Sequence, residues 1–233
     1  MRVLALDAAT EACSVALLDG TDLIGRFEEP GRGHAERLLG MVDEVLAESG
    51  LGLCALDGIA ASVGPGGFTG VRITVAAAQG LAFGAGLGVV PVSTLESLAA
   101  QAVSRGASRV LACLDARMHE VYWGAFLADA PRGVLALSPP RVSGADAVRM
   151  PGDAPYRGIG RGFGAYPALG ALPNLVLDPA DCTRLPNARE IAVLGRLRFA
   201  AGEALDPADL TPLYLRDKVA FTAAERAERA GRS

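Results

Sequence analysis

The chain has 233 residues, of which 51% are hydrophobic and 21% are charged, and its formal net charge is −4. This composition is typical of a globular protein with a large core and excludes a disordered or fibrous chain. The negative net charge also argues against a protein that binds nucleic acid by itself, because neutralising phosphates requires clustered Lys and Arg.

The first predicted elements are a meander of strands and a helix. Apolar runs with short connections predict strands at residues 3–6, 13–18 and about 23–28. An amphipathic helix is predicted by HAERLLGMVDEVLAES, residues 34–49, because its apolar side chains share one broad face and Gly50 follows as a terminator.

A glycine-rich loop joins the next strand to a second helix. LDGIAASV predicts a buried strand, SVGPGGFTGVRI leads into a helix at 70–85, and LGVVPVS predicts another strand. Residues 73–92 are long and apolar enough to span a bilayer, but four glycines and Pro91 divide them into a helix, a turn and a short strand. We therefore expect no membrane span.

The pattern restarts at Arg109. RVLACLDARMHEVYWGAFL repeats the N-terminal order of an apolar strand, an Asp, a short connection and an alternating strand, and RGVLALSPPRV supplies a third strand. Helical character returns at 188–202, and the tail AAERAERAGRS is expected to be solvated. The match of VLALDAAT with VLACLDAR is a faint internal repeat, so we predict an α/β fold of two lobes, residues 1–104 and 105–233.

The loop SVGPGGFTGVRI is a candidate anion site. No register of it supplies the Lys of a Walker A loop, so that motif is excluded. Gly66, Gly67 and Gly70 still permit close backbone approach to an anion. Thr69 is a candidate N-cap of the following helix, whose free N–H groups attract anions. Arg72 falls in the first turn, and a structural salt bridge to a carboxylate of the first lobe is favoured there over a ligand.

Asp7 and Thr10 are a second candidate anion or nucleotide contact. An Asp at the end of a strand and a hydroxyl in the next turn can hold a metal-bound phosphate, but an ordinary Asx-type turn explains the pair equally well. The polar cluster of Asp115, Arg117 and Glu120 lies at a turn between strands, where such clusters are more often structural than catalytic.

Histidines and cysteines indicate neither metal nor redox chemistry. The two histidines, His34 and His119, form no HxxxH or HExxH pair, and the sequence holds no GxSxG nucleophile elbow. The four cysteines lie far apart without a CxxC pair, which favours a reducing cytosol. We therefore predict no metal, no cofactor and a cytoplasmic location.

The two helices of the first lobe offer a different function, which is protein binding. Ala76, Gly80 and Gly84 recur at four-residue spacing, so one face of the second helix is nearly bare backbone. Some apolar positions must pack on the lobe's own sheet, yet the helices carry more apolar surface than one sheet needs. We predict a partner interface made by His34, Leu38, Leu39, Val42, Val45, Leu46, Val71, Val75, Ala78, Gln79 and Ala82.

Several blocks of sequence carry a family resemblance. Most of the first 127 residues are covered by MRVLALDAATEACSVALLDG, HAERLLGMVDEVL, SVGPGGFTGVRITVAAAQGLAFG, VSTLESLA and LDARMHEVYWGAF, and GIGRGFGAY and PLYLRDKVA extend the match. In this order they resemble the TsaB (YeaZ) family, bacterial accessory subunits in the synthesis of threonylcarbamoyladenosine next to the tRNA anticodon.

The resemblance implies a fold and a set of partners. The fold is that of the actin-like ATPase superfamily, with two lobes of RNase H-like topology and mixed sheets flanked by helices. The partners are a paralogous TsaD-like transferase, or a second copy of the chain, bound through the helices at 34–49 and 70–85, together with a TsaE-like ATPase. The tRNA is then reached only through the complex.

Two loops bear on the question of catalysis. Nucleotide-hydrolysing relatives use a DxGxT-like loop in each lobe, but residues 7–10 read DAAT, with Ala9 in place of Gly. The second loop has Arg117 and Met118 where a phosphate loop needs small residues, and the paired metal-binding histidines of TsaD are absent. We therefore predict a non-catalytic subunit that binds and activates a TsaD-like transferase. The alternative is a residual ATPase or phosphotransferase that acts in the interlobe cleft.

Overall fold

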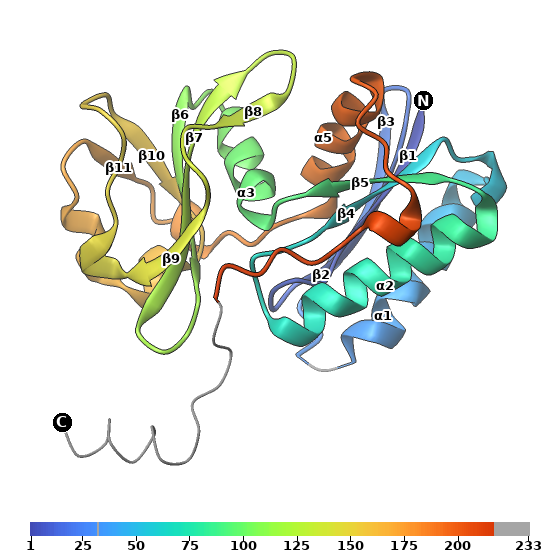
Figure 1. Cartoon of the computed structure of the whole chain (residues 1–233), viewed down its shortest axis with the longest axis horizontal. Coiled ribbons are helices and arrows are strands. Elements are labelled where there is room, and N and C mark those ends of the chain that lie inside the picture. The colour runs from blue at the N-terminus through green and yellow to red at the C-terminus, as the bar shows by residue number, and fades with distance from the viewer. Residues whose placement is uncertain (32, 217–233) are drawn as a thin grey trace.

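The computed structural model describes residues 1–31 and 33–216, which form two β-sheets side by side with helices on their faces (Figure 1). The first sheet contains β1 (Arg2–Asp7), β2 (Cys13–Asp19), β3 (Asp22–Glu28), β4 (Gly58–Ser62) and β5 (Gly88–Val92). Its order is β3-β2-β1-β4-β5, in which β1, β2 and β3 are antiparallel and β4 and β5 continue from β1 in parallel. The predicted meander is therefore confirmed.

The second sheet repeats this arrangement. It contains β6 (Arg109–Asp115), β7 (Glu120–Asp129), β8 (Gly133–Ala136), β9 (Arg141–Gly144), β10 (Tyr156–Ile159) and β11 (Leu175–Leu177). Its order is β11-β10-β6-β7-β8, with β9 also paired to β7, so β6 occupies the central place that β1 has in the first sheet. The repeated VLALD and VLACLD segments fall on these two corresponding strands. The predicted α/β fold with two mixed sheets is confirmed.

Helices cover both faces of the first sheet. They are α1 (His34–Ser49), α2 (Phe68–Ala85) and α5 (Ala188–Ala200). Leu4 and Leu6 of β1 pack with α1 and α2, whereas Val3 and Ala5 face the opposite way and pack with α5. Because successive side chains of a strand alternate between faces, this fully buried strand needs an apolar layer on each side.

The strands of the first sheet precede residue 104, where the sequence predicts the lobe boundary, and those of the second sheet follow it, but the helices are not divided in this way, and the boundary stays a prediction. α3 (Thr94–Val103) precedes the boundary and packs on β6, β7 and β8 of the second sheet. α5 lies in the second half of the sequence and packs on the first sheet. Shorter helices lie in the connections, namely α4 (Gly162–Ala165) and the 3-10 helices Leu53–Ala55, Ala145–Ala147, Pro167–Ala171, Asp181–Thr183 and Pro207–Asp209.

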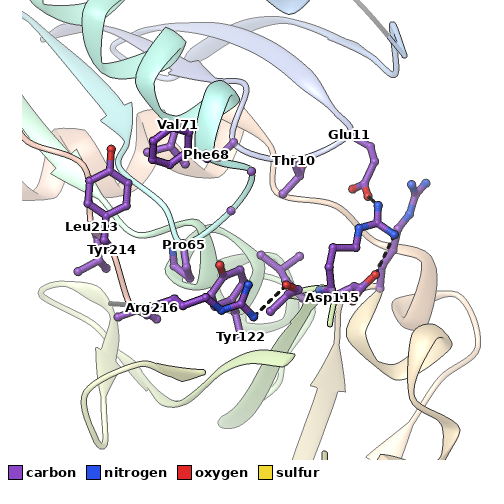
Figure 2. A pocket seen from close by; sticks show the side chains of 18 of the residues that line it. Thr10, Glu11, Pro65, Phe68, Val71, Asp115, Tyr122, Leu213, Tyr214 and Arg216 are labelled. Carbon is purple, nitrogen blue, oxygen red and sulfur yellow. Dashed lines mark hydrogen bonds and ion pairs between the residues drawn. The ribbon is translucent and has the colours of Figure 1, made fainter. Parts of the chain in front are cut away.

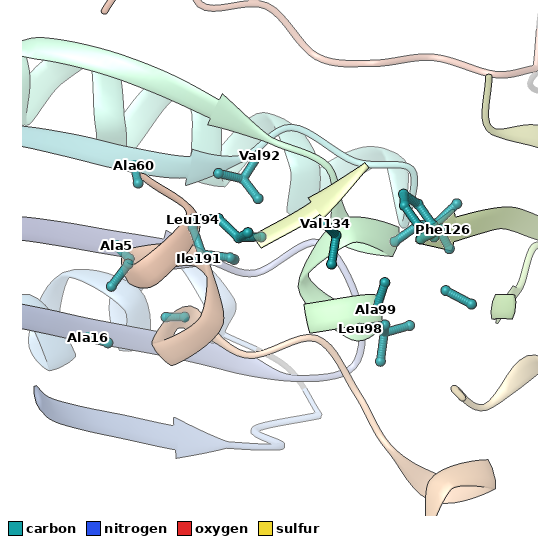
Figure 3. Close-up of a cluster of buried hydrophobic side chains, with 14 of the residues drawn as sticks. Ala5, Ala16, Ala60, Val92, Leu98, Ala99, Phe126, Val134, Ile191 and Leu194 are labelled. Atoms are coloured by element: carbon teal, nitrogen blue, oxygen red, sulfur yellow. The ribbon is translucent and has the colours of Figure 1, made fainter. Parts of the chain in front are cut away.

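One hydrophobic core joins the two lobes. α3 and α5 pack together between the sheets, and the same cluster holds side chains from both sheets (Figure 3), among them Ala5, Ala60, Phe126 and Val134. Gly195 allows α5 to approach β4 closely, since a Cβ at this position would lie 2.4 Å from the Cβ of Ala60. The lobes therefore share buried surface instead of meeting only at a polar interface.

Glycines set the ends of the first-lobe helices. Gly50 adopts a left-handed conformation with φ of 67° and ends α1, as the sequence predicts. α2 begins at Phe68, and the Val71 N–H donates to the carbonyl oxygen of Gly67 at 3.0 Å. Gly67 is thus the N-cap, and the prediction that Thr69 caps this helix is wrong because Thr69 already lies inside the first turn.

The apolar segment at 73–92 is divided as predicted. α2 ends at Ala85, Gly86 reverses the chain with φ of 66°, and β5 follows in the first sheet. Within the described ranges, no helix has both the length and the apolar character needed to cross a membrane.

The last described residues, 205–216, form a C-terminal strap across the molecule (Figure 1). Leu205 pairs with Val89 at the edge of the first sheet. Further along, the Leu213 N–H donates to the carbonyl oxygen of Val63 at 2.7 Å, and Arg216 pairs with Glu120 of the second lobe. The strap thus contacts both lobes. The solvated tail predicted at 223–233 lies outside the described residues.

Candidate functional site

A cavity of about 520 Å³ lies between the lobes (Figure 2). Most of its lining comes from the β1–β2 loop, the glycine-rich loop with the start of α2, the β6–β7 turn with the start of β7, and the C-terminal strap. Their side chains include Thr10, Phe68, Asp115, Tyr122 and Tyr214. Gly31, His34 and Arg161 also line the cavity. The cavity occupies the interlobe position where the alternative prediction placed nucleotide chemistry.

Asp7 does not reach this cavity. Its carboxylate is fully buried, and Oδ1 accepts hydrogen bonds from the Ser62 hydroxyl and from the Ala9 N–H, the latter at 3.1 Å. Burial raises the pKa of the Asp7 carboxyl, although the hydrogen bonds from Ser62 and Ala9 oppose that rise. The predicted anion or nucleotide contact at Asp7 is therefore wrong, and the Asx-type turn is what the structure contains.

Thr10 does line the cavity, but its hydroxyl oxygen accepts a hydrogen bond of 3.3 Å from the Ala12 N–H. In the loop that connects β1 and β2, Thr10 is thus part of a local turn. The structure places Thr10, but not Asp7, at the interlobe cavity.

The glycine-rich loop packs against the β1–β2 loop. The Gly67 N–H donates to the carbonyl oxygen of Ala9 at 2.7 Å. A Cβ at Gly66 would lie 2.1 Å from this oxygen, and a Cβ at Gly70 would lie 2.0 Å from the carbonyl oxygen of Ala8. The glycines therefore allow two protein loops to touch, with carbonyl oxygens on the side where a larger residue would place its Cβ. Gly66 and Gly67 also line the interlobe cavity, and the anion contacts predicted at Gly66, Gly67 and Gly70 stay a prediction.

Arg72 forms no ion pair with a carboxylate of the described residues, so the favoured salt bridge is wrong. Its guanidinium carbon lies 3.7 Å from the centroid of the Phe68 ring, and its Nε donates to the Tyr214 hydroxyl at 2.7 Å. Tyr214 lies on the strap, 142 residues away in sequence. No local pattern in the sequence could indicate this partner.

The β6–β7 turn closes the other side of the cavity with bulky residues. Arg117, Met118 and His119 adopt φ of 60°, 56° and 64°, a left-handed run that is unfavourable for residues with a side chain. The Arg117 N–H donates to Oδ1 of Asp115 at 2.8 Å and holds the turn in place. The polar cluster predicted here is therefore part of a structural turn, and it does not form a glycine-like phosphate cradle.

Ion pairs link the lobes at the mouth of the cavity. Arg117 of the second lobe pairs with Glu11 of the first at 3.1 Å, and Arg161 pairs with Glu29 at 2.9 Å. These side chains are solvent-exposed to a considerable degree, so each pair contributes little to stability. They nevertheless satisfy the arginines that line the cavity and leave little positive charge for a bound anion.

The predicted interface residues on α1 and α2 divide into two sets. Those that hold the helices on the sheet are buried in the core, namely Leu38, Val42, Val45, Val71, Val75, Ala78 and Ala82. The prediction that these residues contact a partner is wrong, because the helices use their most apolar faces against the lobe's own strands. Leu39 is 48% exposed, and Leu46 is half-buried at the margin of the same core.

His34 and Gln79 are also half-buried and have other contacts. His34 lines the interlobe cavity, and its backbone oxygen accepts a weak hydrogen bond from the Cys13 thiol at 3.8 Å. Burial raises the pKa of this thiol to about 11, which argues against a thiolate nucleophile beside the histidine. The Gln79 amide donates to the carbonyl oxygen of Leu210 at 3.1 Å and so holds the strap on α2.

The exposed face of α2 carries residues that the predicted interface omitted. Phe68 is 42% exposed and Phe83 is 61% exposed, at opposite ends of the helix. Ala76, Gly80 and Gly84 of the same helix are also exposed, and a Cβ at either glycine would meet nothing within 4 Å. The four-residue spacing of these small residues was the sequence signal for this face. The two bulky Phe side chains gave no comparable signal.

Two lobes with the same sheet order, around a cleft lined by loops of both lobes, define a protein of the actin-like class built from RNase H-like lobes. The family described as "TsaD: tRNA N6-adenosine threonylcarbamoyltransferase" matches residues 28–130. Over 228 residues the chain is 40% identical to the tRNA threonylcarbamoyladenosine biosynthesis protein TsaB of Escherichia coli strain K12, covering 95% of this chain and 97% of that protein. The chain belongs to the TsaB family, which is also called YeaZ.

Two further comparisons agree with this assignment. The TsaB protein of Haemophilus influenzae is 37% identical over 231 residues, which are 95% of this chain and 96% of that protein. The solved structure of YeaZ from Pseudomonas aeruginosa superposes with a TM-score of 0.85 at 40% identity, over 92% of this chain and 99% of that chain. In the part of the chain that the structure describes, no group of three or more His, Cys, Asp or Glu is placed to hold a metal ion.

Proposed function

We propose that this chain is a non-catalytic subunit that binds a TsaD-like transferase through the outer faces of α1 and α2. In this complex it supports threonylcarbamoyl modification of the tRNA adenosine next to the anticodon. The observation that carries the proposal is the set of large apolar side chains that these helices leave exposed, which are Leu39 on α1 and Phe68 and Phe83 on α2. Large exposed apolar side chains on adjoining helices are typical of a protein interface.

The small residues of α2 favour a helix as the binding partner. Ala76, Gly80 and Gly84 are exposed at four-residue spacing, so they leave a shallow groove along the helix. Another helix can approach such a groove closely, because no side chain keeps the backbones apart.

The match to the TsaD family supports a paralogous partner. The matched residues, 28–130, contain both α1 and α2. A TsaD-like protein is therefore expected to carry helices in corresponding places, and two such pairs can pack about a local twofold axis. The same reasoning makes a homodimer through this face the competing assembly of the isolated chain.

The closed loops support a role without catalysis. Asp7 is buried beneath the β1–β2 loop, and the Gly67 N–H is already bonded to Ala9. A nucleotide that used the Asp7 carboxylate or the Gly67 N–H would have to displace these two loops from each other. The chemistry is therefore assigned to the transferase, with a TsaE-like ATPase as the further partner, tRNA bound through the assembly, and the cytoplasm as the site of action.

Reconstitution tests the proposal. The TsaD-like and TsaE-like proteins of the same organism, with the enzyme that makes the activated threonylcarbamoyl donor, are incubated with unmodified tRNA in the presence and absence of this chain. We expect modification only when the chain is present. Full modification without it would overturn the proposal.

A matched pair of variants locates the interface. Leu39→Asp places a charge on the proposed face, whereas Val176→Asp places one on β11 of the second lobe, where Val176 is 60% exposed. We expect Leu39→Asp to lose co-purification with the transferase, because an unpaired charge buried at an interface is strongly unfavourable. Val176→Asp should co-purify like the unmodified chain, and equal loss in both variants would argue against this face.

A further inference from the structure

Three exposed side chains form a compact cluster at the start of α2, which we call the Arg72 cluster. It consists of Phe68, Arg72 and Tyr214. The guanidinium lies over the Phe68 ring at 3.7 Å and 5.7 Å from the centroid of the Tyr214 ring, and the two rings are 5.9 Å apart. Phe68 and Tyr214 remain 42% and 47% exposed, so the cluster is packed against itself and still open to solvent.

The C-terminal strap fixes Tyr214 in this cluster. Immediately before it, the Leu213 N–H bonds to Val63 at 2.7 Å. Two residues after it, Arg216 pairs with Glu120 and also donates to the carbonyl oxygen of Ala116 at 3.2 Å. A residue held on both sides loses little conformational entropy when a partner binds. The cluster is therefore preorganised, although its members come from distant parts of the chain.

The chemistry of the cluster favours a carboxylate. Nε of Arg72 is bonded to the Tyr214 hydroxyl, and the two terminal nitrogens have no hydrogen-bond partner among residues 1–31 and 33–216. Stacking on Phe68 holds the guanidinium plane, and the open edge presents parallel N–H donors that match a carboxylate in a bidentate way. The first turn of α2 contains no acidic residue that could compete for this edge.

The cluster continues the face that we propose for partner binding. Phe68, Arg72, Ala76, Gly80 and Gly84 follow one another at intervals of four, and all are exposed. Residues four apart are neighbours along a ridge that turns gradually around the helix, and a partner helix that crosses α2 obliquely can follow this ridge. A partner helix that packs along the bare middle of α2 would therefore meet the Arg72 cluster at one end.

We infer that the Arg72 cluster binds a carboxylate side chain of the transferase partner and is an energetic centre of that interface. The inference rests on the proposed function for the identity of the partner. Arg and Tyr in preorganised, partly apolar surroundings are the residues that most often dominate protein interfaces. A protein partner is favoured over RNA because the exposed residues that follow Arg72 along α2, which are Ala76, Gly80, Phe83 and Gly84, add no positive charge with which to neutralise phosphates.

Binding measurements on single variants test the inference. The affinity of the full-length chain for the TsaD-like transferase of the same organism is measured by calorimetry for the unmodified protein and for Arg72→Gln and Tyr214→Ser. We expect Kd to rise about tenfold to a hundredfold in each variant, and the dependence of Kd on salt to weaken in Arg72→Gln. Arg72→Lys should recover little, because it keeps the charge but lacks the planar fork.

Arg141→Gln is the matched control. Arg141 is another exposed arginine beside an aromatic ring, 5.8 Å from the centroid of Trp123, but it lies on β9 of the second lobe. Its substitution should leave Kd unchanged. Thermal unfolding of each variant shows that a loss of affinity does not reflect a loss of folding.

Leu39→Asp separates this inference from the proposed function. If Leu39→Asp abolishes binding while Arg72→Gln binds like the unmodified chain, the Arg72 inference is wrong and the proposed interface stands. If the unmodified chain does not bind the transferase, both are wrong. If Arg72→Gln weakens only the binding of tRNA by the assembled complex and leaves transferase affinity intact, the cluster contacts RNA and the inference is overturned.

Discussion

Replacing Gly70 with Ala tests whether the glycines of the loop before α2 serve packing. A Cβ at Gly70 would lie 2.0 Å from the carbonyl oxygen of Ala8, whereas nonbonded atoms prefer a separation of about 3.5 Å. The β1–β2 loop must therefore shift. That shift strains the bond from the Ala8 N–H to the Thr74 hydroxyl, at 2.9 Å, and the bond from the Gly67 N–H, at 2.7 Å.

The expected magnitude follows from these contacts. Overpacking costs roughly 1–3 kcal/mol and each strained hydrogen bond about 1 kcal/mol, while the higher helix propensity of Ala opposes them by about 1 kcal/mol. We expect the free energy of unfolding to fall by about 3 kcal/mol in Gly70→Ala. Urea unfolding followed by circular dichroism measures this change.

Gly80→Ala provides the control in the same helix. A Cβ at Gly80 would meet nothing within 4 Å, so only helix propensity changes and we expect a gain of about 1 kcal/mol. The reasoning is refuted if Gly70→Ala is as stable as the unmodified chain, or if both substitutions have the same effect. Either result would mean that the two loops are free to separate and that the glycines have another role.

Three further predictions concern the cleft and the strap. The pKa of the Asp7 carboxyl is near 3.8 in the unfolded chain, and burial raises it in the folded protein, so folding takes up a proton. The free energy of unfolding should therefore decline as pH rises from the unfolded pKa through the folded pKa. Asp7→Asn should remove this decline, as measured by urea unfolding at a series of acidic pH values. Arg216→Gln should loosen the strap and accelerate hydrogen exchange of the Leu213 amide by about fivefold, corresponding to roughly 1 kcal/mol; unchanged exchange would show that the ion pair does not hold the strap. Calorimetric titration of the isolated chain with magnesium and ATP should give no saturable binding, because the Gly67 N–H is already bonded within the protein. Micromolar binding that disappears in Thr10→Ala would contradict a role without nucleotide chemistry.

The order and type of the main elements could be predicted from local patterns. Strand alternation located β1, β2 and β3, and the position of Gly50 gave the end of α1. These features depend on residues that are close together in the chain, so their backbone preferences and hydrophobic periodicity can be recognised in a short stretch of sequence. The start of α2 was misplaced by two residues because the loop contains several glycines, each of which can cap a helix.

The candidate interface was only partly predictable for a geometric reason. Periodicity shows which residues share a side of a helix, but α2 is rich in Ala and Gly on every side. Which side meets the sheet is decided by packing, and that packing buried Val71 and Val75 while leaving Phe68 and Phe83 exposed.

The sequence by itself determined the two-lobed α/β fold, the family and the absence of a Walker A loop, because each of these depends on residues close together in the chain. Only the tertiary structure decided that α3 and α5 pack across the lobe boundary. It also decided that the Gly67 N–H donates to the carbonyl oxygen of Ala9, and that Arg72 contacts Tyr214 instead of a carboxylate. These contacts join residues far apart in sequence. They follow from how apolar faces are buried together, which no single segment specifies.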